Sequence, residues 1–379
     1  MYFAVAFLTV SIVGSLITAR TLCGYNHIPA YVKVLVFILF WAMWCMPMIL
    51  GGIRHNELVS ENIYNKLALA GYFLFGAAFL LFALLVLRDI AWSLGYGIAK
   101  LVGKSSTDWS PMNINALTKA NIATLILGIV LSFYALYEGI KLPTVKEISI
   151  STPTVDREIK ILQINDMHIE RSKPVSWFAD VVKLANAQDA DLILMPGDII
   201  DDRVEAIPSH LAELQKLKSK YGIYISAGNH ELYNGLIFIQ IYLQKMGIKW
   251  LSGNGENVEG LPIFVAGIPD LPIVRKKAGF DKILDNAKAE NYKILLAHNP
   301  SMAEEYLGRG FDLQLSGHTH GGQIFPFHIP VWIVNNYLAG LYEIGAGKLY
   351  ISRGTGYWGP PMRLFAPSDM TLIRLQPQK

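Results

Sequence analysis

Four long apolar stretches without a single charged residue lie in the first part of this 379-residue chain. They cover residues 2–19, 34–50, 67–87 and 122–137. Each is about 16 to 21 residues long, and ~20 apolar residues in a helix cross a hydrocarbon layer ~30 Å thick. The stretches therefore predict an all-α transmembrane bundle of about four helices at the N-terminal end.

A cleaved signal peptide is the alternative explanation of the first stretch. Signal peptides begin with a basic segment and end at a cleavage site with small residues. No basic residue precedes this stretch, Arg20 follows it, and further apolar stretches come after. These features favour a membrane helix, and with it a multi-pass protein of the cell membrane.

Lysine and arginine in the short loops predict the orientation of the bundle, because such residues are enriched on the cytoplasmic side. The first and third loops are basic, whereas in the second loop Arg54 and Lys66 are offset by Glu57 and Glu61. We therefore expect the first and third loops in the cytoplasm. With four spans, both termini and the part of the chain that follows the last span then lie outside the cytoplasm, in the periplasm or extracellular space.

From residue 141 the composition changes to alternating apolar and charged runs, as in soluble α/β domains. We expect a transmembrane region at 1–140, a linker and first strand at 141–158, and an α/β domain at 159–379. The expected strands are residues 159–164, 192–195, 223–226, 263–266, 293–297 and 313–315, with helices at 175–186 and 210–218.

Charge and cysteine content exclude several classes of function. A net charge of +3 without a dense Lys/Arg run argues against nucleic-acid binding. The expected spans lack the acidic and basic residues that mark ion or proton paths, which argues against a transporter. Cys23 and Cys45 are the only cysteines, so the second half has no disulfide or thiolate metal site.

Polar side chains that can bind metal directly follow the expected strands. In open α/β sheets, ligands bind beyond the carboxyl ends of the strands, where these side chains would converge. Singly, each motif is weak evidence, since Asp-x-His, Gly-Asp and paired histidines also occur in ordinary turns. Their succession after one strand after another is specific. The residues are Asp166, His168, Asp198, Asn229, His230, His298, His318 and His320.

Imidazole and carboxylate ligands without thiolate suit Mn, Fe or Zn better than Ca or Mg. Two cations ~3.5–4 Å apart, the separation found in two-metal phosphatases, require a shared ligand. Asp198 is the expected bridge, because Gly197 before it allows a tight backbone turn. We expect two divalent metal ions, with Mn favoured and Fe or Zn as alternatives.

The series of motifs resembles the calcineurin-like metallophosphoesterase superfamily, whose pattern runs D-x-H, G-D-x-x-D, G-N-H-E/D, H and G-H-x-H. The resemblance covers about residues 159–375, and the preceding apolar stretches resemble its membrane-anchored bacterial branch. It implies an α/β domain of two packed β-sheets flanked by helices. It also implies one metal held by Asp166, His168, Asp198 and His320, and another by Asp198, Asn229, His298 and His318.

The resemblance further implies phosphoester hydrolysis by a hydroxide that bridges the two ions. His230 would face the phosphoryl group, and Asp201 would orient its imidazole. Ser/Thr protein phosphatases of the superfamily have an arginine directly after that second Asp, and here the position is Asp202, followed by Arg203. This departure argues against a protein phosphatase.

We expect the substrate to be a phosphomonoester, a phosphodiester or a pyrophosphate, and anchoring suggests a lipid-linked phosphate at the bilayer surface. Residues 324–341 and 356–361 would then form an apolar lip, and core strands with a rigid turn are the alternative. Two other functions stay open: a tethered nucleotide or cyclic-nucleotide phosphodiesterase, and a non-catalytic metal-binding membrane module. The sequence does not specify the oligomeric state.

Overall fold

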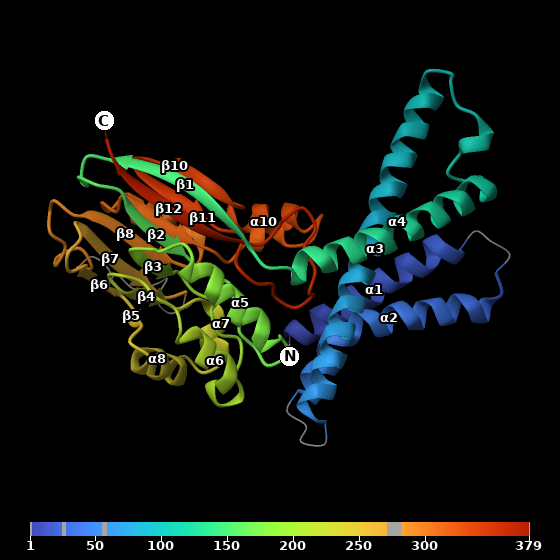
Figure 1. Ribbon diagram of the computed structural model, residues 1–379. Coiled ribbons are helices and arrows are strands. Elements are labelled where there is room, and N and C mark those ends of the chain that lie inside the picture. Colours follow the sequence, from blue (N-terminus) through green and yellow to red (C-terminus); the bar gives the residue numbers. More distant parts are fainter. Residues whose placement is uncertain (1, 25–27, 55–58, 271–281, 379) are drawn as a thin grey trace. The chain divides into compact units, whose positions relative to one another are not determined.

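The computed structural model describes the whole chain except residues 1, 25–27, 55–58, 271–281 and 379. The described chain divides into two compact units (Figure 1). The helical unit comprises Met1–Glu138 together with the short segment Gly359–Leu364, and the α/β unit comprises Gly139–Trp358 and Phe365–Lys379. The chain therefore passes between the units three times.

The helical unit contains four helices that are long and apolar enough to cross a membrane. They are α1 (Tyr2–Cys23), α2 (Ala30–Ile53), α3 (Glu61–Leu101) and α4 (Ile114–Ile140). Each includes one of the apolar stretches of the sequence. The expected N-terminal helical bundle is thus confirmed, and most of the large apolar side chains on α1 and α4 are exposed on the surface of the unit, as lipid-facing residues are.

Helix α3 is much longer than the apolar stretch that predicts it. It has 41 residues and a length of about 60 Å, because the helix continues through residues 88–101 where a loop was expected. At the start of this extension the Arg88 guanidinium donates to Asn121 Oδ1 at 2.7 Å and to Thr124 Oγ1 at 3.2 Å in α4. Asn121 in turn donates to the carbonyl of Thr21 at 2.9 Å, so this polar cluster joins α1, α3 and α4.

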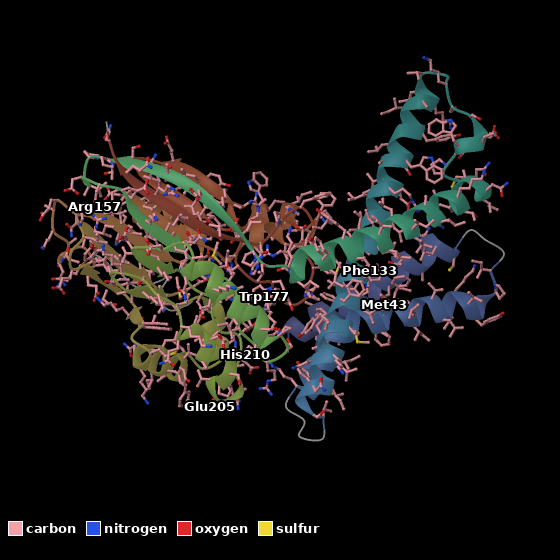
Figure 2. All side chains as sticks on the ribbon, viewed as in Figure 1. Met43, Phe133, Arg157, Trp177, Glu205 and His210 are labelled. Carbon is pink, nitrogen blue, oxygen red and sulfur yellow. The ribbon has the colours of Figure 1, made fainter. Side chains whose placement is uncertain are left out.

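The segment Gly359–Leu364 packs with the helices, although it lies far along the chain. The Arg363 N–H donates to the carbonyl of Ala135 at 2.8 Å. A small apolar groove also lies among the helices, and Met43 and Phe133 are two of its lining residues (Figure 2).

The α/β unit is built from two six-stranded sheets (Figure 1), as the resemblance implies. The first sheet has the order β1 (Thr144–Thr152), β12 (Asp369–Pro377), β2 (Ile159–Gln163), β3 (Leu192–Met195), β4 (Ile223–Ser226) and β5 (Lys249–Leu251). The second has the order β10 (Gly340–Ile344), β11 (Gly347–Ile351), β9 (Leu313–Ser316), β8 (Tyr292–Ala297), β7 (Ile263–Ile268) and β6 (Asn254–Asn257).

Parallel strands form the centre of each sheet. Strands β2, β3, β4 and β5 run parallel, as do β7, β8, β9 and β11. Strand β12 is antiparallel to β2, and β1 lies parallel to β12 over its full length. The segment after α4 therefore enters the first sheet directly, as an edge strand rather than a free linker.

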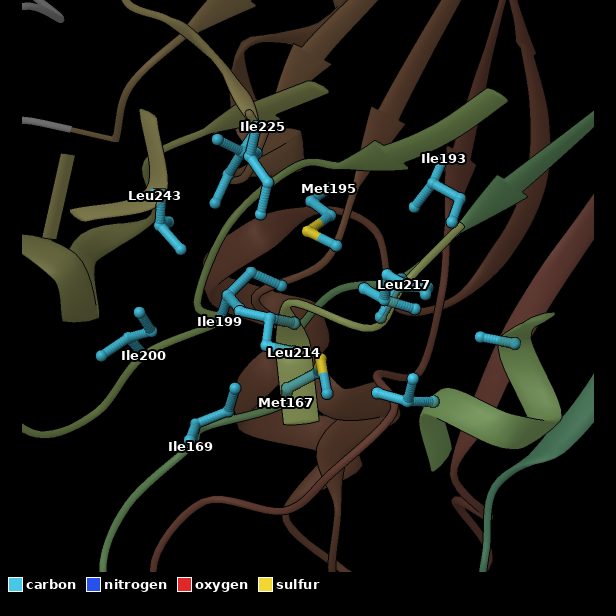
Figure 3. Packing of buried hydrophobic residues seen from close by; sticks show 14 of the residues in the cluster. Met167, Ile169, Ile193, Met195, Ile199, Ile200, Leu214, Leu217, Ile225 and Leu243 are labelled. Carbon is cyan, nitrogen blue, oxygen red and sulfur yellow. The ribbon is translucent and has the colours of Figure 1, made fainter. Parts of the chain in front are cut away.

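The hydrophobic core has three layers. Alternate residues such as Ile159 and Ile161 of β2 meet Ile294 and Leu296 of β8 between the two sheets. The outer face of the first sheet is covered by α5 (Val175–Asn186), α6 (Pro208–Leu214) and α8 (Leu236–Lys245). Figure 3 shows this layer, in which Leu243 and Leu214 are among the side chains of the cluster. Helix α9 (Ala303–Leu307) covers the second sheet. These layers hold the strand ends, and thus the loops after them, in fixed positions.

Candidate metal centre

The metal-competent side chains predicted from the sequence come together at one edge of the two sheets. Each lies shortly after the carboxyl end of a parallel strand, in a loop or at the start of a helical turn, and neighbouring parallel strands end at the same edge. Asp166 and His168 follow β2, Asp198 follows β3, Asn229 follows β4, His298 follows β8, and His318 and His320 follow β9. The structure thus brings the predicted side chains together beyond the carboxyl ends of the strands, where the sequence predicted that they would converge.

One cluster comprises Asp166, His168 and His320, whose ligand atoms are close enough to share a metal ion. Nε2 of His168 lies 3.0 Å from Nε2 of His320, and the latter lies 3.4 Å from Asp166 Oδ1. At this distance one imidazole nitrogen can donate to the other, or both can direct a lone pair at a shared cation. A cation between them would satisfy both nitrogens.

Asp198 belongs to two other groups that could hold an ion, one of them with His168 and His230. Its Oδ2 lies 2.9 Å from Nε2 of His298, and Asp166, Asp198 and His298 form a further group able to hold an ion. Beside them, Asn229 Oδ1 lies 3.2 Å from Nδ1 of His318, and the rings of His298 and His318 are 5.2 Å apart. Asp198 and Asp166 thus each belong to two groups, as a ligand shared by two ions would.

Burial makes the charges of this site interdependent. It raises the pKa of Asp166 to about 6, with His298 opposing and Asp198 adding to the effect. It lowers the pKa of His168 to about 4. Burial also acts on His298, but the carboxylate of Asp198 outweighs it and raises the pKa of His298 to about 10. Two buried carboxylates side by side require positive charge nearby, and divalent cations fit that requirement.

The backbone of the predicted ligands is unusual. Asp166 (φ 50°), His168 (φ 46°), Asp198 (φ 53°), His318 (φ 71°) and His320 (φ 49°) all adopt left-handed conformations. Non-glycine residues rarely do so, and each such residue costs of order 1–3 kcal/mol. Such strain clusters at functional sites, where it aims side chains at a common point.

Two glycines make room for the carboxylates. A Cβ atom at Gly228 would overlap the side chain of Asp198, and one at Gly317 would overlap that of Asp166. The glycines of the G-N-H-E and G-H-x-H motifs therefore allow one loop to approach the aspartate of another. Any larger residue would displace that carboxylate.

His230 and Asp201 form a pair at the edge of the cluster. Nδ1 of His230 lies 2.7 Å from Asp201 Oδ1, and the His230 N–H donates to Asp198 Oδ1 at 2.9 Å. Asp201 Oδ2 also lies 3.5 Å from Nδ1 of His168. Asp201 thus contacts both imidazoles, and its contact to His230 is the one that the resemblance implies.

The departure at Asp202 has a structural explanation. Its buried carboxylate accepts two hydrogen bonds from the Arg171 guanidinium, from Nε at 2.9 Å and from Nη2 at 3.1 Å. A bidentate pair of this kind fixes the loop after the Asp-x-His motif to the loop after Asp198. The side chain of Arg203, by contrast, is exposed.

Three residues that support the site were not identified from the sequence. Asn165 donates to Asp166 Oδ2, Glu231 accepts from the backbone of the Asp198 loop, and Lys173 donates to the carbonyl of His168. Glu231 carries a signal that could have revealed it, because it lies three residues after Gly228, the spacing of a capping box. A lone lysine such as Lys173 carries none.

Most residues of the two segments considered for an apolar lip lie outside the sheets. Residues 324–341 contain helix α10 (His328–Asn335), in which only Asn335 is buried. In the second segment Trp358 is exposed and its ring lies 5.7 Å from that of His230, whereas Tyr357 is half-buried beneath the ammonium of Lys173. Within residues 324–341 only Gly340 and Leu341 belong to a strand, at the start of β10, so the segment is mainly helical rather than a core strand.

Comparison with known proteins agrees with this geometry. Residues 159–322 match the model of the calcineurin-like phosphoesterase family. An uncharacterized metallophosphoesterase of Campylobacter jejuni is 29% identical, over 92% of this chain and 91% of that one. One from Aquifex aeolicus is 30% identical, over 58% of this chain and 85% of that one.

A relative whose name describes a transmembrane protein is also similar. The transmembrane protein with metallophosphoesterase domain of Danio rerio is 30% identical, over 68% of this chain and 63% of that one. Similarity to such a protein agrees with the four apolar helices found here. The chain therefore belongs to the calcineurin-like metallophosphoesterase family, which binds divalent metal ions and hydrolyses phosphoesters.

Proposed function

We propose that this protein hydrolyses a phosphoester with two divalent metal ions, Mn in the first place and Fe or Zn as alternatives. The observation that carries the proposal is the 3.0 Å separation of the His168 and His320 Nε2 atoms beside two buried aspartates. One ion would be held by Asp166, His168, Asp198 and His320, and the other by Asp198, Asn229, His298 and His318.

The ions would supply an activated water near neutral pH and would offset negative charge on the phosphoryl group. The chain itself supplies the acid. Asp201 holds Nδ1 of His230, which leaves Nε2 on the side of Asp198, 4.0 Å from its Oδ2. From there a protonated His230 stabilises charge on the phosphoryl oxygens or donates its proton to the leaving oxygen.

The proposed substrate is a lipid-linked phosphate at the membrane surface. Support comes from the apolar helices of the same chain and from exposed aromatic side chains at the site. The rings of Tyr233 and Trp358 lie 5.5 Å and 5.7 Å from that of His230, and both residues are exposed. Aromatic rings beside a polar centre suit a ligand with a phosphate head and an apolar tail.

The test of hydrolysis uses the full chain in detergent micelles, loaded with Mn, and compares aryl phosphate mono- and diesters, nucleotides and phosphatidic acid. Asp198→Asn should lower turnover at least about 100-fold. Asp189→Asn is the matched control, because Asp189 is exposed and shares the left-handed backbone of Asp198. Equal activity of the two variants would remove Asp198 from the mechanism, and faster turnover of nucleotides than of lipid would favour the nucleotide phosphodiesterase.

We further propose that the α/β unit lies on the extracytoplasmic side, as the basic first and third loops indicate. A variant with Cys23→Ala and Cys45→Ala offers no thiol, so Glu259→Cys in that background places one label site on the exposed surface of the unit. A membrane-impermeant maleimide should label this site in intact cells whose outer membrane is permeable. Labelling only after lysis would reverse the orientation.

A further inference from the structure

Helix α10 exposes its apolar side chains and buries a polar one, the reverse of an ordinary surface helix. Ile329, Trp332, Ile333 and Val334 are 55%, 57%, 63% and 76% exposed, and only the polar Asn335 is buried. Surface helices of globular proteins place their apolar stripe on the core and their polar residues in water. Here the apolar side chains face outward. Together with Phe327, which precedes the helix and is also exposed, they form what we name the α10 face.

The sequence around α10 contains no charge. No Asp, Glu, Lys or Arg occurs from Ile324 to Tyr342. Exposed helices of soluble proteins usually carry charged residues on the side that faces water. A contiguous apolar face of this kind marks an interaction with another protein or with a membrane.

The α10 face is adjacent to the metal centre. The 3-10 turn His320–Gly322 leads into the segment before α10, and a Cβ atom at Gly322 would come within 2.5 Å of His328 Cα. Gln323 then exchanges two hydrogen bonds with the backbone of Trp358, at 2.9 Å and 3.1 Å. The chain that carries the predicted ligand His320 thus continues directly into the apolar face.

The start of α10 is linked through Phe325 to a residue at a crossing to the helical unit. The ring of Phe325 lies 5.9 Å from His328, the first residue of α10, and 5.8 Å from the exposed ring of Phe365. Phe365 directly follows Gly359–Leu364, the segment that packs with the membrane-spanning helices, and Trp358 directly precedes it. Trp358 and Phe365 are thus each joined by one peptide bond to the segment Gly359–Leu364, which packs with the helices.

These observations favour lipid over a protein as the occupant. The chain contains its own candidate membrane-spanning helices, and Phe365 directly follows a segment that packs with them. Eight residues of helix are about 12 Å long, too short to span a bilayer, so α10 could lie only in its plane. Tryptophan beside aliphatic residues is typical of the boundary between headgroups and acyl chains.

We propose that the α10 face lies in the headgroup and upper acyl region of the bilayer that the chain's helices span, and so holds the metal centre at the membrane surface. Such binding is a property separate from hydrolysis. It concerns where the α/β unit binds, and it holds for any phosphoester substrate.

The test measures the depth of a spin label in the membrane. The full chain with Cys23→Ala and Cys45→Ala carries Ile333→Cys, is labelled with a nitroxide and is reconstituted into phosphatidylcholine–phosphatidylglycerol vesicles. Collision with oxygen, which concentrates in lipid, is compared with collision with a water-soluble nickel chelate. Leu127→Cys, at an exposed position of α4, is the lipid control, and Glu259→Cys is the water control.

We expect the Ile333 label to collide more with oxygen than with the nickel chelate, as the Leu127 label does. Collision with the chelate at the level of Glu259 would overturn the proposal, because the face would then be in water. Low collision with both agents would also overturn it, because the face would then pack against protein. If Ile333→Cys does not fold, a label at Val334 repeats the measurement. Neither the collision with oxygen nor that with the nickel chelate requires turnover, so this test is independent of the test of hydrolysis.

Discussion

The carboxylate of Glu231 accepts a hydrogen bond from the backbone N–H of Asp198 at 3.0 Å, although Glu231 lies in the short helix α7 (Asn229–Tyr233) and Asp198 in the loop after β3. The same buried carboxylate accepts from the N–H groups of Ile199, Ile200 and Gly228 at 2.7, 3.0 and 2.8 Å. Each of its oxygens thus receives two donors that would otherwise be buried without partners. Glu231 therefore fixes the loop of Asp198 against the start of α7.

Replacing this carboxylate by an amide should damage the site. Glu231→Gln places an NH₂ group opposite two backbone N–H donors, which then lose their acceptor. The expected loss in the free energy of unfolding is about 1–3 kcal/mol, or a fall in Tm of about 2–4 °C per kcal/mol. Calorimetry of the full protein checks this, with the exposed Glu259→Gln as the control. An unchanged Tm with unchanged metal affinity would contradict the role given to Glu231.

The pair of His230 and Asp201 predicts a pH dependence. Burial disfavours the charged imidazole, but the hydrogen bond to Asp201 and the charge of Asp198 outweigh it and raise the pKa of His230 to about 9. A group with a raised pKa is protonated below that pKa and loses its proton as the pH rises through it. Hydrolysis that needs protonated His230 should therefore decline on the alkaline side.

Asp201→Asn removes the negative charge that holds the His230 proton, so the pKa of His230 falls. The alkaline limb of the profile of kcat/KM against pH should then shift to lower pH, whereas Asp189→Asn should leave it in place. His230→Gln should lower kcat about 10²–10⁴-fold and abolish this limb. An alkaline limb at the same pH in the wild type and in Asp201→Asn would show that another group titrates there.

Lys173 links the Asp-x-His loop to the turn before Trp358. Its buried ammonium donates to the carbonyls of His168 at 2.8 Å and Tyr357 at 2.7 Å, and lies 4.2 Å from the centre of the Tyr357 ring. Lys173→Met keeps much of the aliphatic packing and removes these donors. Because His168 is then less well held, we expect Mn affinity to fall about 10–100-fold.

Titration of metal-free protein with Mn measures this affinity without turnover. Lys183→Met is the matched control, since Lys183 is exposed on α5. If Lys173→Met bound Mn as tightly as this control, Lys173 would be a packing residue with no influence on the metal centre.

The position of the site could be predicted because it depends on topology. Residues 159–164 were expected as a strand, and β2 is Ile159–Gln163, so Asp166 is placed at the strand end by short-range pattern alone. The expected helix 175–186 is likewise α5. Once strands are parallel, their carboxyl ends share an edge, and residues as distant as Asp166 and His320 meet there.

Other features depend on contacts that no local pattern encodes. The left-handed backbone of Asp166 and Asp198 follows from the packing of several loops, including the glycines that make room for their carboxylates. The continuation of α3 through Arg88 depends on partners in α4. The exposure of the apolar side chains of α10 could not be predicted either. An apolar run predicts burial without specifying whether protein or lipid surrounds it.

The binding of two cations around Asp198 is the central claim, and elemental analysis of the purified full-length protein tests it most directly. After loading with Mn and removal of free metal, the wild type should retain two metal ions per chain and Asp198→Asn fewer than one, with Asp189→Asn equal to the wild type. Retention of no metal by the wild type, or equal retention by wild type and Asp198→Asn, would contradict the account.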